Sequence, residues 1–261
     1  MDLGLSDKTC LVLGGGGGLG GAIGRTLAAE GARVALADVS IEAAEKVLQS
    51  IRDAGGKASA IQWNLDDLSV IDENIGKIES EFGEIDILIN NTGGPPPTPA
   101  SGQATSSWEK HFHSMVLSVI AVTDRVLPAM RRKHWGRIIT STSSGVIVPI
   151  PNLGISNALR LSLVGWSKTL AREVGPDGVT ANIVLPGRIA TTRITFLDEQ
   201  KAKRETRAVE DVARESAESI PLQRYGQPQE YADVVAFLAS ERASYVTGSV
   251  IRIDGGMIQS I

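Results

Sequence analysis

Val12-Leu13-Gly14-Gly15-Gly16-Gly17-Gly18-Leu19-Gly20 is the stretch that decides the fold of this chain. An apolar run at residues 9–13 precedes it, and apolar residues at helical spacing follow it at 19–30. Glycine suits a sharp turn from strand to helix that must approach a pyrophosphate closely, and the first amides of the helix attract the phosphate charge. The turn therefore predicts a dinucleotide site whose contacts are Gly14, Gly16, Gly17, Gly18, Leu19 and Gly20.

Strand-like and helix-like segments alternate along the rest of the chain. Strands are expected at residues 33–37, 58–63, 85–89, 137–141, 179–185 and 249–253, and helices at 41–54, 68–82, 108–132 and 153–174. Such alternation is typical of right-handed β-α-β crossovers. It predicts an α/β fold with a single doubly wound (Rossmann) parallel β-sheet flanked by helices on both faces.

Domain organisation follows from the absence of a linker or an internal repeat. Residues 1–261 are therefore expected to form one Rossmann domain. Two stretches break the alternation. The proline-rich stretch 93–99 predicts a stiff loop at the end of a strand. The charged stretch 188–221 predicts one or two short helices, either a lid over the substrate or a solvated surface helix.

Composition narrows the class of protein. The chain is 42% hydrophobic and 21% charged, with a net charge of −4, which favours neither nucleic acid nor an anionic membrane as a partner. No targeting segment is evident at the N-terminus, so a cytoplasmic location is expected. The single cysteine, Cys10, falls in the first predicted strand and is expected to be a buried thiol. No metal site is expected.

Asp38 bears on the choice of cofactor. It ends the second predicted strand, about 20 residues after the glycine turn, where a ribose ligand is expected. Its carboxylate accepts hydrogen bonds from ribose hydroxyls and repels a 2′-phosphate, so NAD is predicted over NADP. The alternative is an aspartate that caps the next helix, although Ser40 is the more natural N-cap.

Several segments resemble the short-chain dehydrogenase/reductase family, and the likeness extends over essentially all 261 positions. The glycine turn is similar to the motif Thr-Gly-x-x-x-Gly-Ile-Gly, Asn90-Asn91-Thr92-Gly93 to Asn-Asn-Ala-Gly, and Pro186-Gly187-Arg188-Ile189-Ala190-Thr191 to Pro-Gly-x-Ile-x-Thr. Within the family, the proteins labelled 3-oxoacyl-acyl-carrier-protein reductase-like resemble the chain most, notably around residues 94–97 and 151–160.

The resemblance implies further cofactor contacts, an oligomeric state and an activity. It assigns Asn64 and Leu65 to the adenine ring, Asn91, Thr92 and Gly93 to the adenosine, and Pro186, Gly187, Ile189 and Thr191 to the nicotinamide carboxamide. It implies a homotetramer with helices 108–132 and 153–174 at an interface. It also implies NAD-dependent oxidation or reduction of a small molecule at a carbonyl or secondary alcohol group.

The chain departs from the family at the catalytic positions. Of the family's Asn, Ser, Tyr and Lys, only the serine is retained, as Ser143, while Met115, Ser156 and Arg160 replace the others. Ser156 and Arg160 stand at i and i+4 on one helix face. An alkyl alcohol is a far weaker acid than a phenol, and lost acid-base assistance typically lowers the rate by about 10²- to 10⁴-fold.

Other roles are open at this stage. Arg160 is expected to anchor the nicotinamide ribose, because a guanidinium does not release a proton. His111, one helical turn before Met115, is either a substitute proton donor or an ordinary packing histidine. The leading hypothesis is an oxidoreductase with an altered proton path through Ser143, Ser156 and Arg160. The alternatives are an inactive NAD-binding homologue acting as a sensor or partner subunit and, less favoured, a lyase or dehalogenase.

Overall fold

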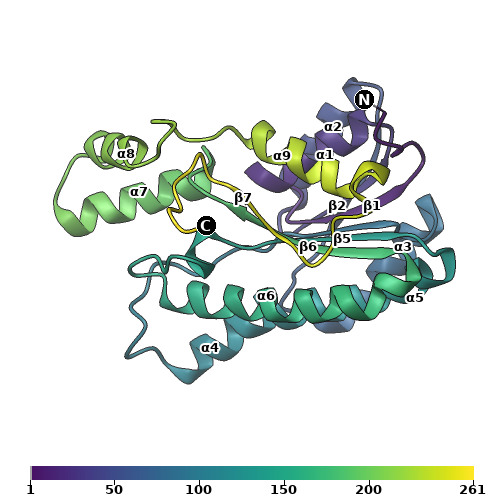
Figure 1. Cartoon of the computed structure of the whole chain (residues 1–261), viewed down its shortest axis with the longest axis horizontal. Helices are drawn as coiled ribbons and strands as arrows, with labels where there is room; N and C mark the ends of the chain where they lie inside the picture. Colours follow the sequence, from purple (N-terminus) through teal and green to yellow (C-terminus); the bar gives the residue numbers. More distant parts are fainter. Residues whose placement is uncertain (1) are drawn as a thin grey trace.

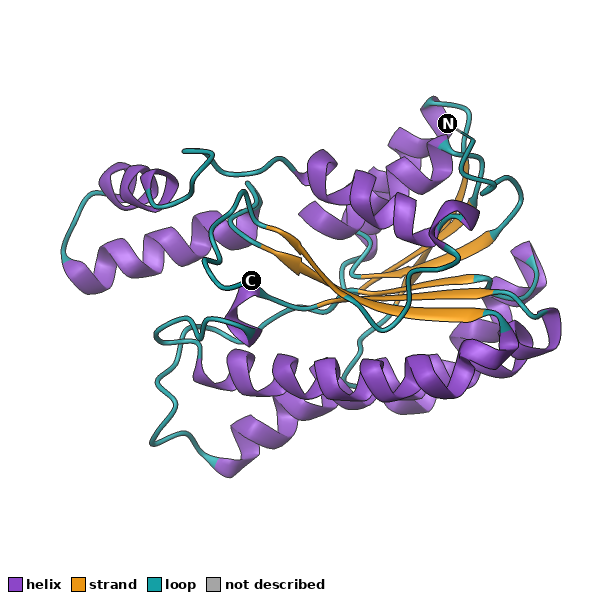
Figure 2. Cartoon of the chain, in the orientation of Figure 1, coloured by secondary structure: helices purple, strands orange, loops and turns teal. Residues whose placement is uncertain are grey.

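The computed structural model describes residues 2–261 and contains one parallel sheet between two layers of helices (Figure 2). Its strands are β1 (Thr9–Leu13), β2 (Arg33–Asp38), β3 (Lys57–Gln62), β4 (Ile87–Asn90), β5 (Gly136–Ser141), β6 (Val179–Pro186) and β7 (Val250–Ile253). They lie in the order β3-β2-β1-β4-β5-β6-β7, and every neighbouring pair is parallel. The predicted doubly wound α/β fold is confirmed.

Helices cover both faces of the sheet (Figure 1). One face carries α1 (Gly18–Ala29), α2 (Ile41–Asp53) and α9 (Pro228–Ala239), and the other carries α3 (Ile71–Phe82), α5 (Ser118–Lys133) and α6 (Gly154–Val174). Apolar side chains from the strands alternate between two large buried clusters, one under each layer. Cys10 is fully buried in the first of these, as expected, and burial raises the pKa of its thiol.

Three further helices lie toward one end of the sheet. They are α4 (Thr105–Phe112), α7 (Thr192–Glu205) and α8 (Val209–Glu218), of which α7 and α8 extend beyond the strands on the left in Figure 1. The charged stretch 188–221 therefore contains two helices. The helix expected at 68–82 is divided, because a 3₁₀ turn at Leu68–Val70 precedes α3.

The long helical run Thr105–Lys133 contains α4, a π-helical turn and α5. It meets the length and apolarity of a membrane span, with a mean hydropathy of 1.2 over its most apolar 18 residues. Half of that window is buried inside the fold, where α5 packs against the sheet and a third apolar cluster joins the run to α6. The apolar residues are thus accounted for by packing within the domain.

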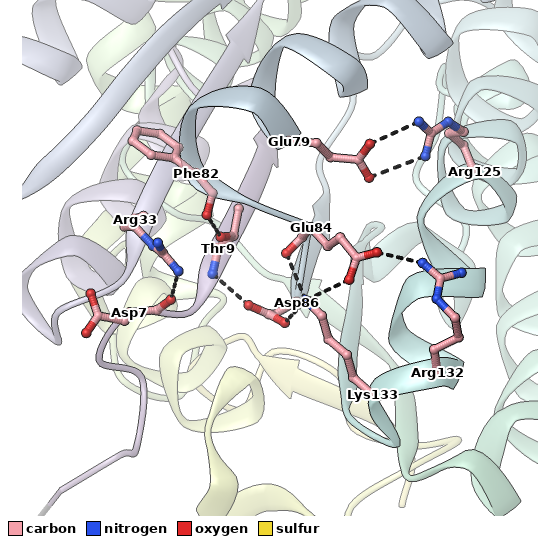
Figure 3. A network of polar contacts seen from close by, with 10 residues as sticks. All are labelled: Asp7, Thr9, Arg33, Glu79, Phe82, Glu84, Asp86, Arg125, Arg132 and Lys133. Carbon is pink, nitrogen blue, oxygen red and sulfur yellow. Dashed lines mark hydrogen bonds and ion pairs between the residues drawn. The ribbon is translucent and has the colours of Figure 1, made fainter.

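The amino-terminal end of the sheet is held by a network of charged side chains (Figure 3). Asp86, which is 7% exposed, accepts hydrogen bonds from the Thr9 amide at 2.9 Å and from Lys133 Nζ at 2.8 Å. Nearby, Arg132 donates to Glu84 at 2.6 Å. These contacts join β1, the start of β4 and the end of α5. The network therefore stabilises the end of the sheet opposite the glycine turn.

The sheet order reverses between β1 and β4, because β2 lies on one side of β1 and β4 on the other. In doubly wound sheets ligands bind beyond the carboxyl ends of the strands at such a switch point. Gly14 and Asn91 follow these two strands, and Asn91 Nδ2 donates to Gly14 O at 3.4 Å. The topology thus places the glycine turn where a ligand site is expected.

Candidate functional site

The glycine turn has the shape of a phosphate cradle. Gly14 has φ of +61°, and a Cβ there would lie 2.7 Å from Asn91 O. A Cβ at Gly20 would lie 2.0 Å from Gly14 O, so no side chain fits at either position. The amides of Gly18, Leu19 and Gly20 have no backbone or capping partner within residues 2–261. Three unpaired amides at the start of a 12-residue helix suit a pyrophosphate.

Asp38 lies beside this cradle at the end of β2. Its carboxylate accepts from the Gly16 amide at 3.0 Å and from the Ser40 amide at 3.1 Å. Ser40 is the N-cap of α2, accepting from the Ala43 amide at 3.2 Å, so Asp38 is not the cap. Each carboxylate oxygen retains a lone pair for a ribose hydroxyl. The structure thus removes the capping alternative and directs the acid at the glycine turn.

The predicted adenosine contacts lie at the ends of the neighbouring strands. Asn64 follows β3, is exposed, and accepts from the Asp66 amide through Oδ1 at 3.1 Å, with Leu65 half-buried beside it. Thr92 and Gly93 follow Asn91 after β4. Thr92 Oγ1 is buried and has no partner within residues 2–261, whereas Gly93 is exposed and an added Cβ there would meet no atom within 4 Å. These residues share one end of the sheet with the glycine turn.

The predicted nicotinamide clasp begins where β6 ends, at Pro186. The Gly187 amide donates to Ile253 O at 2.9 Å, and a parallel bridge joins Ile189 to Gly226. Thr191 is the N-cap of α7. A Cβ at Gly18 would lie 2.7 Å from Thr191 Cγ2, so this segment meets the phosphate cradle directly. Residues more than 170 positions apart are thereby brought together.

Ser143 is half-buried at the N-cap of a 3₁₀ turn that follows β5. Its Oγ accepts from the Gly145 amide at 3.1 Å, which leaves the hydroxyl hydrogen to donate to a bound oxygen. Asn157, on the first turn of α6, holds this segment in place by donating to Ile150 O at 2.9 Å, and its Oδ1 faces Gly145. The positioning by Asn157 was not predicted, because it depends on the contact between two separate loops.

The asparagine and tyrosine positions of the family are occupied by residues that are buried. Met115 is 1% exposed and packs in the third apolar cluster with Ile155 and Leu159. Ser156, between those two residues on α6, is 6% exposed. Met115 lies within the π-helical turn His113–Leu117, a departure from regular helix that often marks a functional site. In this chain the turn carries an apolar side chain at that position, and sequence reasoning did not predict the turn.

Arg160 reaches from α6 to the ends of β4 and β5. Its guanidinium donates to Ser141 O at 3.2 Å, Thr92 O at 3.1 Å and Gly93 O at 3.0 Å, and the residue is 8% exposed. Burial, followed by the charge of Arg193, lowers the pKa of Arg160 to about 10, so it remains a cation at neutral pH. Arg160 therefore contacts Thr92 and Gly93, two of the predicted cofactor residues. That Arg160 anchors the nicotinamide ribose remains a prediction.

None of the three tyrosines, which all lie within residues 2–261, replaces the phenol that the family has at the position of Ser156. Tyr231 is fully buried on α9 with its hydroxyl 2.8 Å from Ser141 Oγ, and burial raises its pKa. Tyr225 donates to Asp198 at 2.7 Å, and Tyr245 is fully exposed.

Burial lowers the pKa of His111, whose charged neighbours are Lys110 and Asp66, and no hydrogen bond joins it to Ser143.

One further residue that sequence reasoning missed is Arg193, in the first turn of α7. It is half-buried and donates from Nη2 to Pro95 O at 2.6 Å. The contact joins the stretch 188–221 to the proline-rich loop, which is tied to the start of α6 where the Thr98 amide donates to Asn152 O at 2.7 Å. A contact across 98 positions leaves no local signal in the sequence.

The fold, the glycine cradle and the clasp define an oxidoreductase of carbonyl or alcohol groups, and the chain belongs to the short-chain dehydrogenase/reductase family. The family model described as enoyl-(acyl carrier protein) reductase matches residues 15–258. Among curated relatives, the 3-oxoacyl-[acyl-carrier-protein] reductase FabG of Escherichia coli is 37% identical, over 96% of this chain and 97% of its own. FabG of Aquifex aeolicus is 34% identical, over 98% and 100%.

Solved structures agree with this assignment. L-sorbose reductase from Gluconobacter frateurii, complexed with NADPH and L-sorbose, superposes with a TM-score of 0.94 at 28% identity, covering 100% of both chains. YwfH, an NADPH-dependent reductase involved in bacilysin biosynthesis, superposes with a TM-score of 0.92 at 29% identity, covering 98% of this chain and 100% of its own. Both of these neighbours are described with NADPH, a nicotinamide dinucleotide.

Proposed function

We propose that this protein transfers a hydride between a nicotinamide dinucleotide and a carbonyl or secondary alcohol carbon of a small molecule, as a 3-oxoacyl-acyl-carrier-protein reductase-like enzyme with an altered proton path. The observation that carries the proposal is the cradle of unpaired amides at Gly18 to Gly20, closed by Thr191 and flanked by Asn91. The bound dinucleotide would supply the hydride. The protein's own residues bind its phosphates, ribose and carboxamide.

Ser143 and Arg160 are the groups that we assign to the substrate oxygen. Ser143 donates a hydrogen bond to it, and the buried positive charge of Arg160 favours the negative charge that develops there. Ser156 adds a second hydroxyl on the same face of α6 as Arg160. Neither hydroxyl is an acid strong enough to release a proton at pH 7, so the proton comes from water. We expect turnover about 10²- to 10⁴-fold slower than with a positioned phenol.

For the cofactor, we propose NAD rather than NADP. The support is Asp38, whose carboxylate is fixed beside Gly16 and would meet a 2′-phosphate with like charge. The two residues that follow, Val39 and Ser40, bring no positive charge to that position. The relatives favour the other choice, since several solved neighbours are described with NADPH. The proposed preference for NAD therefore rests on Asp38 of this chain, and it is tested by measuring the dissociation constants of both dinucleotides.

An inactive dinucleotide-binding homologue, acting as a sensor or a partner subunit, is the second candidate function. It is favoured by one observation, the burial of Met115 and Ser156 at positions that are polar and catalytic in the family. On this alternative the cradle binds the dinucleotide and no hydride is transferred. Binding and turnover must therefore be measured separately.

The deciding experiment titrates the purified protein with NADH and with NADPH, following nicotinamide fluorescence. The cofactor that binds more tightly is then assayed with a panel of ketones and secondary alcohols. The proposal expects NADH to bind more tightly and slow turnover of at least one substrate, lost on Ser143→Ala. Tight binding without turnover of any panel member would favour the inactive homologue, and absence of binding by either dinucleotide would exclude both.

The remaining assignments concern the surroundings of the site. We propose that residues 188–221, containing α7 and α8, form a lid over the substrate, since Arg193 reaches across to Pro95. We also propose a homotetramer with an interface formed by residues 108–132 and 153–174, which lie mainly in α4, α5 and α6. Ala158, Leu161 and Gly165 face away from the sheet and are exposed, with Leu161 at 52%. Cytoplasmic location and the absence of nucleic acid or membrane as partners stay predictions.

A further inference from the structure

Two arginines meet at one glycine of the site without any acidic partner. A Cβ placed at Gly94 would lie 3.2 Å from Arg193 Nη2 and 3.6 Å from Arg160 Nη2. No carboxylate within residues 2–261 forms an ion pair with either guanidinium. Asp198, an acid on α7, is 3% exposed and is already paired with Arg188 at 2.9 Å and Tyr225 at 2.7 Å.

Two cations held close together without an anion lower the stability of the fold. A buried charge requires a partner of opposite sign or several hydrogen bonds, and like charges at close range repel each other. Arg160 satisfies part of this need with three carbonyl oxygens, which bear only partial charges. Arg193 has one such contact, to Pro95 O, and most of its five N–H groups are left for another acceptor.

Gly94, the glycine that both guanidiniums approach, lies on an exposed part of the proline-rich loop. Gly93 and Gly94 are exposed, and a Cβ on Gly93 would meet no atom within 4 Å. Arg193 also belongs to the first turn of the 14-residue helix α7, whose amino-terminal end favours negative charge. An anionic group beside Gly94 would therefore receive hydrogen bonds mainly from Arg193, and a single carboxylate would offset one of the two positive charges.

The geometry points to a subsite for a carboxylate of the substrate, formed mainly by Arg193 beside Gly94, with the buried charge of Arg160 adjacent to it. This inference rests on the proposed function in one respect only, namely that the carboxylate belongs to the molecule whose carbonyl or alcohol group reacts. The substrate class is then a small oxo acid or hydroxy acid, with its charged end held between α7 and the proline-rich loop. A cofactor phosphate is the other source of a similar anion, and the test separates the two.

The test measures binding of malonate, a dicarboxylate without a ketone or alcohol group, by calorimetry with and without saturating NADH. Arg193→Gln should weaken malonate binding by about 10- to 100-fold, because charge-assisted hydrogen bonds are lost, while Arg193→Lys retains part of the affinity. Arg204→Gln is the matched control, since it removes one exposed cation from the same helix. NADH affinity should be unchanged in all three variants.

A second measurement compares turnover of acetoacetate with that of its uncharged methyl ester. We expect the wild type to prefer the acid in kcat/KM and Arg193→Gln to lose that preference, while Arg204→Gln keeps it. Equal malonate binding by wild type and Arg193→Gln, or none by the wild type, would overturn the subsite. A parallel loss of NADH affinity would assign the arginines to the cofactor instead. If neither ketone reacts, the proposed function fails, and malonate binding still decides the subsite.

Discussion

The two ends of the same sheet hold charged residues in opposite arrangements. At the amino-terminal end, Lys133 and Arg132 each meet a carboxylate, so the network around Asp86 is close to neutral (Figure 3). At the carboxyl end, the hydrogen-bond acceptors of Arg160 and Arg193 within residues 2–261 are backbone oxygens. Paired charges suit an edge that only has to hold the fold, whereas unpaired cations and amides are suited to ligands that carry negative charge.

The comparison predicts that changes at the carboxyl end alter activity and changes at the amino-terminal end alter stability. The largest effect is expected for Ser143→Ala, because it removes a hydrogen-bond donor from the substrate oxygen. We expect kcat to fall by about 10²- to 10³-fold, with little change in NADH affinity. Ser80→Ala, which removes an exposed hydroxyl on α3, is the control and should leave kcat unchanged. Unchanged turnover in Ser143→Ala would remove this residue from the mechanism.

At the opposite end, Asp86→Ala should lower the free energy of unfolding by about 2–3 kcal/mol. The variant leaves the Thr9 amide and the Lys133 ammonium without their acceptor in a largely buried setting. Urea unfolding followed by circular dichroism measures the change, and NADH titration of the folded variant should match the wild type. A variant as stable as the wild type, or one with weakened cofactor binding, would contradict the separation of the two ends.

At the carboxyl end, the charge of Asp38 is expected to decide which of the two dinucleotides binds more tightly. Asp38→Asn should weaken NADH binding and strengthen NADPH binding, moving the ratio of the two dissociation constants by about 10-fold or more. Asp53→Asn removes an exposed carboxylate from the end of α2 and should leave the ratio unchanged. Fluorescence titration gives both constants. If the wild type binds NADPH more tightly than NADH, the proposal that Asp38 selects NAD is wrong.

The smallest effect is expected at the exposed margin of the amino-terminal network. Glu84→Gln should cost about 0.5 kcal/mol of stability, since its pair with Arg132 is largely exposed. The hydrogen bond from Arg132 lowers the pKa of Glu84, so its contribution is present above the ordinary carboxyl pKa and is lost as pH falls through the lowered value. Urea unfolding at neutral and acidic pH should show the two proteins converging in acid. A difference that grows in acid would contradict this sign.

The sequence predicted local features of the fold and site well, because they are written in short patterns. The glycine turn, the alternation of strands and helices, and the N-cap at Ser40 needed only neighbouring residues. The contacts of Arg160 and Arg193 were not predicted, since they join β4, β5 and α7 across the fold. The π-helical turn at Met115 also has no sequence pattern of its own.

The three carbonyl contacts of Arg160 have a consequence for how molecules enter and leave. They tie the ends of β4 and β5 to α6, so that wall of the site is rigid. On the opposite side, a hydrogen bond from Arg193 to Pro95 O joins α7 to the proline-rich loop. If residues 188–221 form the proposed lid, we expect substrate and product to enter and leave on the α7 side, after the Arg193–Pro95 hydrogen bond breaks.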